Sequence, residues 1–281
     1  MLPEAKGQDL LYVSDAVEST VFVLSYPRGK LVGTLTGFST PTGECTDAAG
    51  DVWVTNRNSA ESGYLTEYAH GGSEPIATLE DPGSPIGCSV DRNTGDLAAT
   101  NYTGDVAIYK NAQGSPATYS DPDIPNYFYC TYDSAGDLFV DGAASGVVAE
   151  LPNGGTALQT VKLNSSVIPA SIDWDGTNLA VVDNRGEPRG PTPVDRVAVS
   201  GSTGTIIGTT LLKSPGNRRT SEDPQYFLIG KNIVGANRYR HRGTGLTVLL
   251  WRYPGGGEPI KELYEGSPSI VGAVVSPAEK R

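Results

Sequence analysis

Polar side chains close a phrase that recurs along the chain, and they are the first candidates for chemistry. "GECTDAAGDVWVTN" (Gly43–Asn56) is followed by "GCSVDRNTGDLAATN" (Gly87–Asn101), and both copies end on an Asn. Amide and carboxylate oxygens can bind cations or hydrogen-bond a ligand. They can also cap a strand and hold the loop that follows it. The aligned last residues of the six copies are Asp15, Asn56, Asn101, Gly142, Asp183 and Asn237.

Arginine gathers in three long connections of the later repeats, at 183–196, 213–224 and 237–245. Guanidinium groups bind carboxylate or phosphate through paired hydrogen bonds and stack on planar groups. The sequence therefore predicts a basic sector that binds an anionic ligand, unless these arginines pair with carboxylates of the same connections and fasten the loops. The basic residues are Arg185, Arg189, Arg196, Arg218, Arg219, Arg238, Arg240, His241 and Arg242.

Nucleophilic catalysis has little support in the residue types. The chain contains two histidines; His70 falls in a hairpin turn expected on the opposite side, and only His241 can lie near the basic sector. No G-x-S-x-G nucleophile turn is present. Glu222 and Asp223 are the best-placed acidic pair for glycoside chemistry, but a solvated loop explains them more simply. The sequence assigns no catalytic residue.

Three cysteines, Cys45, Cys88 and Cys130, fall in the same part of three successive repeats, with no C-x-x-C pair. Cys88 and Cys130 lie three residues before an Asp, whereas Cys45 lies two before, which predicts that Cys45 faces the other side of its strand. This offset argues against a shared soft-metal site. The sequence predicts three small buried hydrophobic residues and no disulfide framework.

The repeated phrase itself predicts a pair of strands joined by a tight turn. In "DxxGD", Asp binds nearby backbone N–H groups and Gly adopts a positive φ, so these Asp residues are expected to be structural. The residues concerned are Asp47, Asp51, Asp91, Asp96, Asp133 and Asp137. A turn of this kind is not expected to converge enough oxygen ligands for calcium.

Each phrase is followed by a hairpin pattern around a Gly-rich turn, such as "VFVLSYPRGKLVGTL" (Val21–Leu35). Each unit thus holds four antiparallel strands, A to D, at a period of about 40 to 45 residues, which is that of a β-propeller blade. Six copies of strand B predict six blades, and the C-terminal "SPSIVGAVVSP" (Ser267–Pro277) is expected to supply strand A beside the N-terminal strand B and close the ring. The anchors of strand B are Leu11, Val52, Leu97, Leu138, Leu179 and Ile233.

Composition limits the partners. The 281 residues carry a net charge of −11, which disfavours nucleic acid and anionic membranes as partners of the whole surface. The apolar runs are too short to span a membrane, and the first residues, "MLPEAKGQDLL", lack a signal-peptide pattern.

The phrases "P-x-G…D-x-x-G-D-L" resemble those of the NHL-repeat and SMP-30-like six-bladed propellers. Pro41, Gly43, Pro85 and Gly87 belong to this pattern, together with the turn Asp and Gly residues. The resemblance implies the fold and a bacterial secreted location. Its functional implication is broad, because such propellers include binding modules, lactonases and lyases.

The resemblance to SMP-30 also implies a divalent metal in the central channel, held by an early Glu of strand A and by Asn and Asp residues of other blades. Glu44 in "PTGE" can fill the first role, with Asn101 or Asp183 as distant partners. The remaining phrases depart from the family's pattern, since only Asn126 in "PNYF" carries the expected amide.

The sequence thus predicts a single all-β domain over 1–281, with blades at 268–281 plus 7–36, 41–80, 85–120, 125–164, 169–213 and 223–265. We expect an exported, monomeric, non-enzymatic protein without a cofactor, located outside the cell or in the periplasm. It is expected to bind a small anionic ligand, an acidic glycan or an acidic protein segment at the loop-rich mouth of the channel. The polar residues that end the copies of strand B are expected to form a ring around this mouth, with the basic sector at one side. The alternative is a hydrolase, lactonase or lyase with a divalent cation such as calcium.

Overall fold

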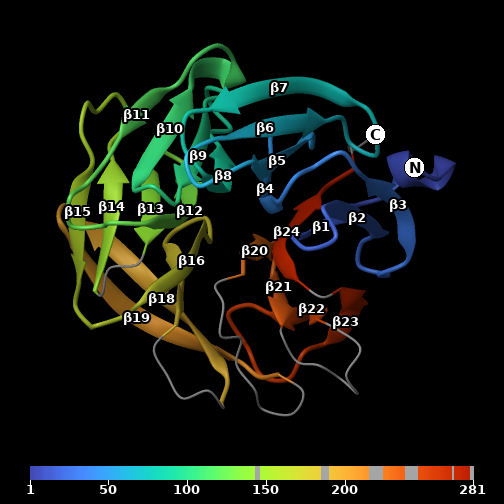
Figure 1. Ribbon diagram of the computed structural model, residues 1–281. Coiled ribbons are helices and arrows are strands. Elements are labelled where there is room, and N and C mark those ends of the chain that lie inside the picture. The colour runs from blue at the N-terminus through green and yellow to red at the C-terminus, as the bar shows by residue number, and fades with distance from the viewer. Residues whose placement is uncertain (143–145, 185–189, 215–223, 238–245, 268, 279–281) are drawn as a thin grey trace.

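The computed structural model describes residues 1–281 except 143–145, 185–189, 215–223, 238–245, 268 and 279–281. Its sheets stand around a common axis like the blades of a propeller (Figure 1). The regular structure is strand apart from two short 3-10 helices within this described part, η1 (Pro3–Gly7) and η2 (Lys110–Ala112). The predicted all-β, propeller-like fold is confirmed.

Four sheets contain four strands each. They are, in order of pairing, β24 (Ile270–Ser276), β1 (Leu10–Asp15), β2 (Thr20–Ser25) and β3 (Leu31–Leu35); β4 (Pro41–Thr46), β5 (Val52–Arg57), β6 (Gly63–Tyr68) and β7 (Pro75–Asp81); β8 (Pro85–Val90), β9 (Leu97–Asn101), β10 (Asp105–Tyr109) and β11 (Ala117–Tyr119); and β20 (Tyr226–Ile229), β21 (Asn232–Asn237), β22 (Leu246–Arg252) and β23 (Lys261–Ser267). Each hydrophobic anchor lies in the second strand of its set.

The fifth sheet has eight strands, where the sequence predicts two separate blades. Its order is β12 (Tyr127–Tyr132), β13 (Leu138–Gly142), β14 (Val147–Leu151), β15 (Gln159–Leu163), β19 (Thr203–Leu212), β18 (Thr192–Ser200), β17 (Leu179–Asp183) and β16 (Pro169–Trp174). The join is a short parallel pairing of Lys162 with Thr203 and of Leu163 with Gly204. Gly204 permits this approach, because a Cβ there would lie 2.6 Å from the Leu163 side chain.

The ring closes through the two ends of the chain. β24 pairs antiparallel with β1, with Val13 opposite Ala273 and Leu10 opposite Ser276. The predicted closure of the N-terminal sheet by the C-terminal strand is confirmed. Because this strand supplies the inner edge of the first sheet, β1 is paired on both sides.

The core lies between neighbouring sheets. Alternate residues of β1 face opposite neighbours: Tyr12 packs in a cluster with Val52 and Val54, whereas Leu11 packs in a cluster with Val234. Strand B is therefore buried on both faces, which explains why its residues read as a nearly continuous apolar run.

Hydroxyl groups near the axis fasten some of the neighbouring sheets to one another. The Thr55 hydroxyl lies 2.9 Å from the carbonyl oxygen of Gly43 and 3.0 Å from that of Ile86 in the neighbouring sheet. The equivalent Thr100 hydroxyl lies 2.7 Å from the carbonyl oxygen of Phe128. A Cβ on Gly43 would lie 2.6 Å from the carbonyl oxygen of Ile86, so the repeated "P-x-G" glycine allows the inner strands to approach.

Candidate functional site

The buried polar residues at the ends of strand B hold neighbouring loops, either the loop that follows strand B or the loop that leads into strand A. The Asp15 carboxylate accepts hydrogen bonds from the backbone N–H groups of Val17 (2.9 Å) and Glu18 (2.8 Å). The Asn56 side-chain oxygen likewise accepts from Ser39 (2.8 Å) and Thr40 (3.0 Å). These contacts match the loop-capping interpretation of the two residues.

The other members of the predicted ring follow the same pattern where the structure describes them. The Asn101 amide donates to Asp105 (2.8 Å), and the Asp183 carboxylate accepts from the backbone of Ile168 (3.1 Å). Asn237 ends β21, and its side chain lies outside what is described. Ligand binding by this ring stays a prediction.

Most of the predicted basic sector, namely Arg185, Arg189, Arg218, Arg219, Arg238, Arg240, His241 and Arg242, lies outside the described residues. Arg196 is described, and the structure corrects its assignment to a loop: it lies within β18, opposite Ala180 of β17. β18 begins earlier than the sequence predicts, at Thr192. Binding of an anion by this sector stays a prediction.

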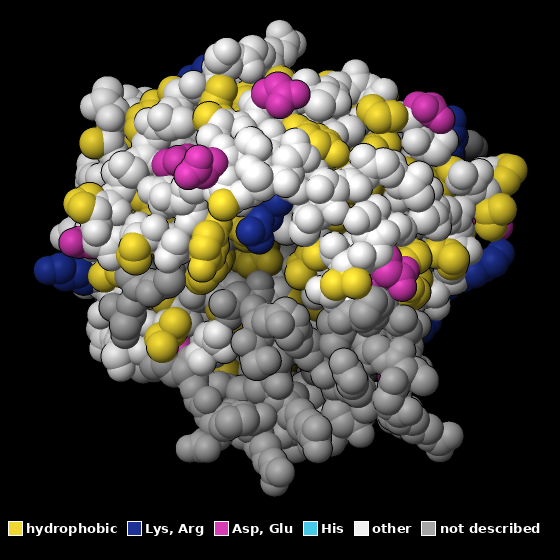
Figure 2. Space-filling view, viewed as in Figure 1, with side chains coloured by type: hydrophobic (Ala, Val, Ile, Leu, Met, Phe, Trp, Pro, Cys, Tyr) yellow, Lys and Arg dark blue, Asp and Glu magenta, His cyan; other side chains and the backbone are white. Residues whose placement is uncertain are grey.

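The face shown in Figure 2 carries a few acidic and basic side chains scattered singly among apolar and uncharged ones. No single type forms a continuous patch among its coloured residues. A cavity is therefore a better guide to a site than this face.

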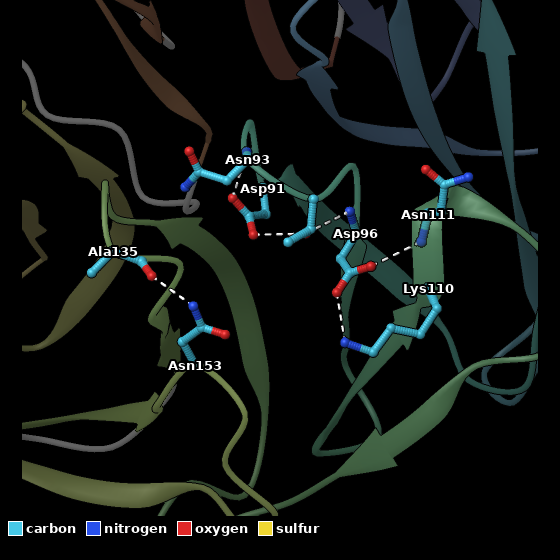
Figure 3. Close-up of polar contacts among 8 residues, drawn as sticks. Asp91, Asn93, Asp96, Lys110, Asn111, Ala135 and Asn153 are labelled. Carbon is cyan, nitrogen blue, oxygen red and sulfur yellow. Dashed lines mark hydrogen bonds and ion pairs between the residues drawn. The ribbon is translucent and has the colours of Figure 1, made fainter.

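The turns of the repeated phrase are held by their own Asp residues (Figure 3). Asp91 accepts hydrogen bonds from the Asn93 backbone (2.9 Å) and the Thr94 hydroxyl (2.7 Å). Asp96 binds the Lys110 ammonium group (2.6 Å) and the Asn111 backbone (2.8 Å). The structural role predicted for these Asp residues is confirmed.

A pocket of ≈ 580 Å³ opens at the end of the channel that carries these turns. Its wall consists of the inner strands β4, β8, β12, β16 and β20 and of turn residues that follow them, such as Asn93, Ser134 and Gly176. Strand B runs from these turns to the far end of its sheet. The pocket and the predicted ring therefore lie at opposite ends of the channel, and Asp15, Asn56, Asn101 and Asp183 are not among the lining residues.

Two side chains bridge sheets that are not neighbours in the ring, and one of them, Gln225, lines the inner end of the pocket. The Tyr129 hydroxyl of β12 donates to the Val271 carbonyl oxygen of β24 (3.2 Å). The Gln225 side-chain amide accepts from the Glu44 backbone N–H (2.9 Å) and donates to the Glu44 carbonyl oxygen (2.6 Å). The channel thus ends as a cup.

Glu44 lies at this closed end, which agrees with its predicted place in the channel. Its side chain is fully buried, and neither carboxyl oxygen has a well-formed hydrogen bond within the described chain. Burial raises the pKa of Glu44 well above its usual value, and the nearby Ser14 hydroxyl offsets this only in part. The carboxyl group occupies space left by Gly272, where a Cβ would meet it.

The outer wall is acidic and aromatic. Asp133, Asp173 and Asp175 line it, with Arg92 as the basic residue among the described lining. Burial raises the pKa of Asp173 to about 6, although the backbone N–H groups of Leu228 (2.7 Å) and Trp174 (2.8 Å) donate to its carboxylate. The aromatic lining residues are Tyr132, Trp174, Tyr226, Phe227 and Tyr253.

The cysteine prediction is wrong for two of the three residues. Cys45 and Cys88 form a disulfide between β4 and β8, with a Cα–Cα distance of 5.5 Å. The one-residue offset between Cys45 and Cys88 is what allows the bond. The A strands of neighbouring sheets face each other, so two side chains that point to opposite sides of their own strands meet between the sheets. Cys130 is a buried free thiol, as predicted. All three line the pocket.

The residues near Glu44 do not fit the donor set that a divalent metal needs. Asn101 and Asp183 are engaged at the other end of the channel, and the Asn126 amide donates to the Tyr102 carbonyl oxygen (2.7 Å). Among the described residues, the one group of three carboxylates with closely spaced oxygens is Asp47, Asp51 and Glu67, outside the pocket. Binding of calcium by the protein stays a prediction.

Comparison with known proteins supports the fold. No protein-family model and no curated protein sequence matches the chain. The fold is similar to that of a protein of unknown function from Bacteroides caccae (TM-score 0.65, 12% identity, covering 97% of this chain and 100% of that one). It is also similar to U3-55K (TM-score 0.59, 12%, 91% and 77%) and to hydrazine synthase of Kuenenia stuttgartiensis (TM-score 0.57, 13%, 80% and 68%).

These identities show the fold alone. They agree with a β-propeller and leave the narrower resemblance to NHL-repeat and SMP-30-like proteins as a proposal. No helix among the described residues has both the length and the hydropathy needed to cross a membrane.

Proposed function

We propose that this protein binds a small molecule in the channel pocket and does not transform it. The observation that carries the proposal is the cup itself, a cavity of ≈ 580 Å³ whose lining includes Gln225, which reaches across the channel to the backbone of Glu44. Small-molecule sites typically measure about 300 to 1,000 Å³ and combine an apolar wall with a few polar groups. The pocket has this size, and its lining combines aromatic side chains with charged and polar groups.

The arrangement of the pocket's acidic groups favours binding over catalysis. The Glu44 oxygens are buried away from solvent, so they do not reach a ligand in the open part of the cup. Asp173 and Asp175 are each held by backbone N–H donors, as structural turn residues are. His70, the histidine that the structure describes, is absent from the lining. We therefore assign no catalytic residue.

We also propose that the ring has six blades and that the protein works outside the cytoplasm. The eight-stranded sheet consists of two antiparallel runs of four, β12 to β15 and β16 to β19, which together with the other sheets make six units. A disulfide such as Cys45–Cys88 persists in oxidising compartments, which supports an extracellular or periplasmic location.

A pocket-blocking variant tests the binding proposal. Leu228 lines the pocket, whereas its neighbour Ile229 does not. Compounds that raise the melting temperature of the wild type would be found in a screen of neutral, cationic and anionic metabolites. We expect Leu228→Trp to abolish these shifts and the control Ile229→Trp to retain them. Equal shifts in both variants, or release of a chemically altered compound, would contradict the proposal.

A further inference from the structure

The equivalent turns of two neighbouring units carry a feature that the other turns lack. In the β12–β13 and β16–β17 turns an aromatic residue directly precedes the turn Asp, as Tyr132–Asp133 and Trp174–Asp175. In the β4–β5 and β8–β9 turns, the residue before the turn Asp is not aromatic: Thr46 precedes Asp47, and Val90 precedes Asp91. Both aromatic–Asp pairs line the pocket, whereas Asp47 and Asp91 do not. The two repeats that carry an aromatic residue before the turn Asp thus place both residues in the pocket lining.

The carboxylates of this wall are oriented by neutral donors. Asp133 accepts from the backbone N–H groups of Ala135 (2.8 Å) and Asp137 (3.0 Å). Asp175 accepts from Thr177 (2.9 Å) and from the Tyr253 hydroxyl (3.0 Å). No ion pair with a described Lys or Arg is formed by either group. These hydrogen bonds hold the carboxylates without neutralising their charge.

Charges around the pocket leave the wall negative. Asp133, Asp173 and Asp175 outnumber Arg92 in the described lining, and Arg196, which acts on Tyr253 electrostatically, is not a lining residue. Asp91 and Asp96 add negative potential near Tyr132. An anionic ligand is therefore repelled, and a cation is attracted.

The separation of the lining carboxylates argues against a single metal ion as the ligand. No three lining carboxylates in the described chain bring their oxygens close enough together to form a metal-binding group. A ligand that matches separated carboxylates carries separated positive charges. The aromatic residues beside them suit its apolar stem and also attract ammonium groups through their π faces.

We propose that the pocket binds a linear diamine or polyamine, with ammonium groups at Asp133 and Asp175 and the methylene chain against Tyr132 and Trp174. This inference rests on the proposed function, because it names the ligand class of the same pocket. The probes are 1,4-diaminobutane and spermidine, compared with the neutral 1,4-butanediol and the dianion succinate. Titration calorimetry at moderate salt measures their affinities.

The variants separate pocket binding from attraction to an acidic surface. Asp133→Asn and Asp175→Asn remove charge but keep an amide oxygen that can accept the backbone hydrogen bonds. Asp47→Asn is the matched control, because Asp47 accepts from Ala49 and Asp51 as Asp133 does from Ala135 and Asp137 but lies outside the pocket. We expect each pocket variant to weaken spermidine binding about tenfold and the control to leave it unchanged.

Three results would overturn the inference. They are no binding of either amine, a loss of spermidine affinity in Asp47→Asn equal to that in the pocket variants, or retained spermidine binding in the Asp133→Asn/Asp175→Asn double variant. The last two would assign amine binding to the acidic surface at large. If a neutral or anionic compound binds in a manner that Leu228→Trp abolishes while the amines do not bind, the pocket is still a binding site and only the ligand class is wrong.

Discussion

Single residues explain why the repeated phrase ends as it does. The hydroxyl that precedes the closing Asn, as in Thr55 and Thr100, contacts a carbonyl oxygen of the neighbouring sheet. The Asn side chain then holds the outgoing or incoming loop, as Asn56 does. The conspicuous polar residues of the repeat therefore hold the sheets and loops of the propeller together. The residues that distinguish the pocket are less regular in sequence.

One half-buried carboxyl group, that of Glu67, predicts a pH dependence of stability. Burial raises the pKa of Glu67 to about 7, with the charges of Asp47 and Asp51 adding to the effect. The folded protein thus retains a proton that the unfolded chain releases near its usual value of 4.5. The stabilisation is complete below that value and is lost as the pH rises through about 7.

We expect Glu67→Gln to reduce the fall in unfolding free energy between pH 4.5 and pH 7. Urea denaturation at several pH values measures it. Other buried carboxyl groups contribute slopes of the same sign, so the informative quantity is the difference between wild type and variant. Glu74→Gln, at an exposed position in the β6–β7 turn, is the control. An unchanged slope in Glu67→Gln would show that this group does not titrate as described.

The sequence predicts part of the site at this scale. A Glu in the "P-x-G-E" phrase is expected in the channel, and Glu44 lies there. The pocket itself is not predicted, because its aromatic residues come from positions that look like ordinary strand ends. Tyr132 and Trp174 each stand directly before a turn Asp, and that departure from the repeat is the signal that could have revealed them.

Strands and their interfaces follow from the repeat more fully than single residues do. The alternation of apolar and polar residues and the Gly-rich turns predict four strands in each unit, and the observed sheets contain them. The pairing of β15 with β19 is not predictable in this way, because it joins edges of separate units through two residue pairs. The disulfide also depends on which faces of neighbouring strands meet.

The geometry of that disulfide predicts where a second disulfide can be introduced by substitution. Cys88 pairs across its sheet with Ala99, and Cys130 pairs with the equivalent Val140. Cys45 and Ser89 occupy equivalent positions, opposite Trp53 and Ala98 respectively. Position 89 should therefore face Cys130 as Cys45 faces Cys88.

We expect Ser89→Cys to form a disulfide with Cys130 and to raise the melting temperature, because the new bond closes a loop of similar length. Thiol counting under denaturing conditions and intact mass measure its formation. The matched control is Ser89→Cys/Cys130→Ser, in which the new thiol has no partner and stays free. A free thiol at position 89 in the single variant would refute the equivalence of the two interfaces.

The whole molecule depends on closure by its last strand. β24 contributes Val274 and Val275 to two different core clusters, and its Val271 carbonyl oxygen accepts hydrogen bonds from both Tyr129 and Gln225. Its removal would open the first sheet, expose the edge of β1 and undo the closed end of the pocket. The overall ring and its closure are the features that the sequence predicts best, because every repeat contributes to them.

We expect a chain that lacks residues 268–281 to aggregate or to elute as oligomers, since the exposed edge of β1 can pair with another molecule. Size-exclusion chromatography with light scattering measures this. A chain that lacks only 279–281 is the control and should elute like the full chain. A monomeric, cooperatively unfolding protein without β24 would show that closure is dispensable.

The parallel join between β15 and β19 has a consequence for recognition by other chains. Proteins often recruit a partner segment by adding it to an exposed sheet edge, where free backbone groups bind the new strand. β15 and β19 cover each other in part, whereas β3, β7, β11 and β23 end their sheets without a partner strand in the described structure. A peptide that docks by strand addition would therefore be directed to one of these four edges and away from the joined pair.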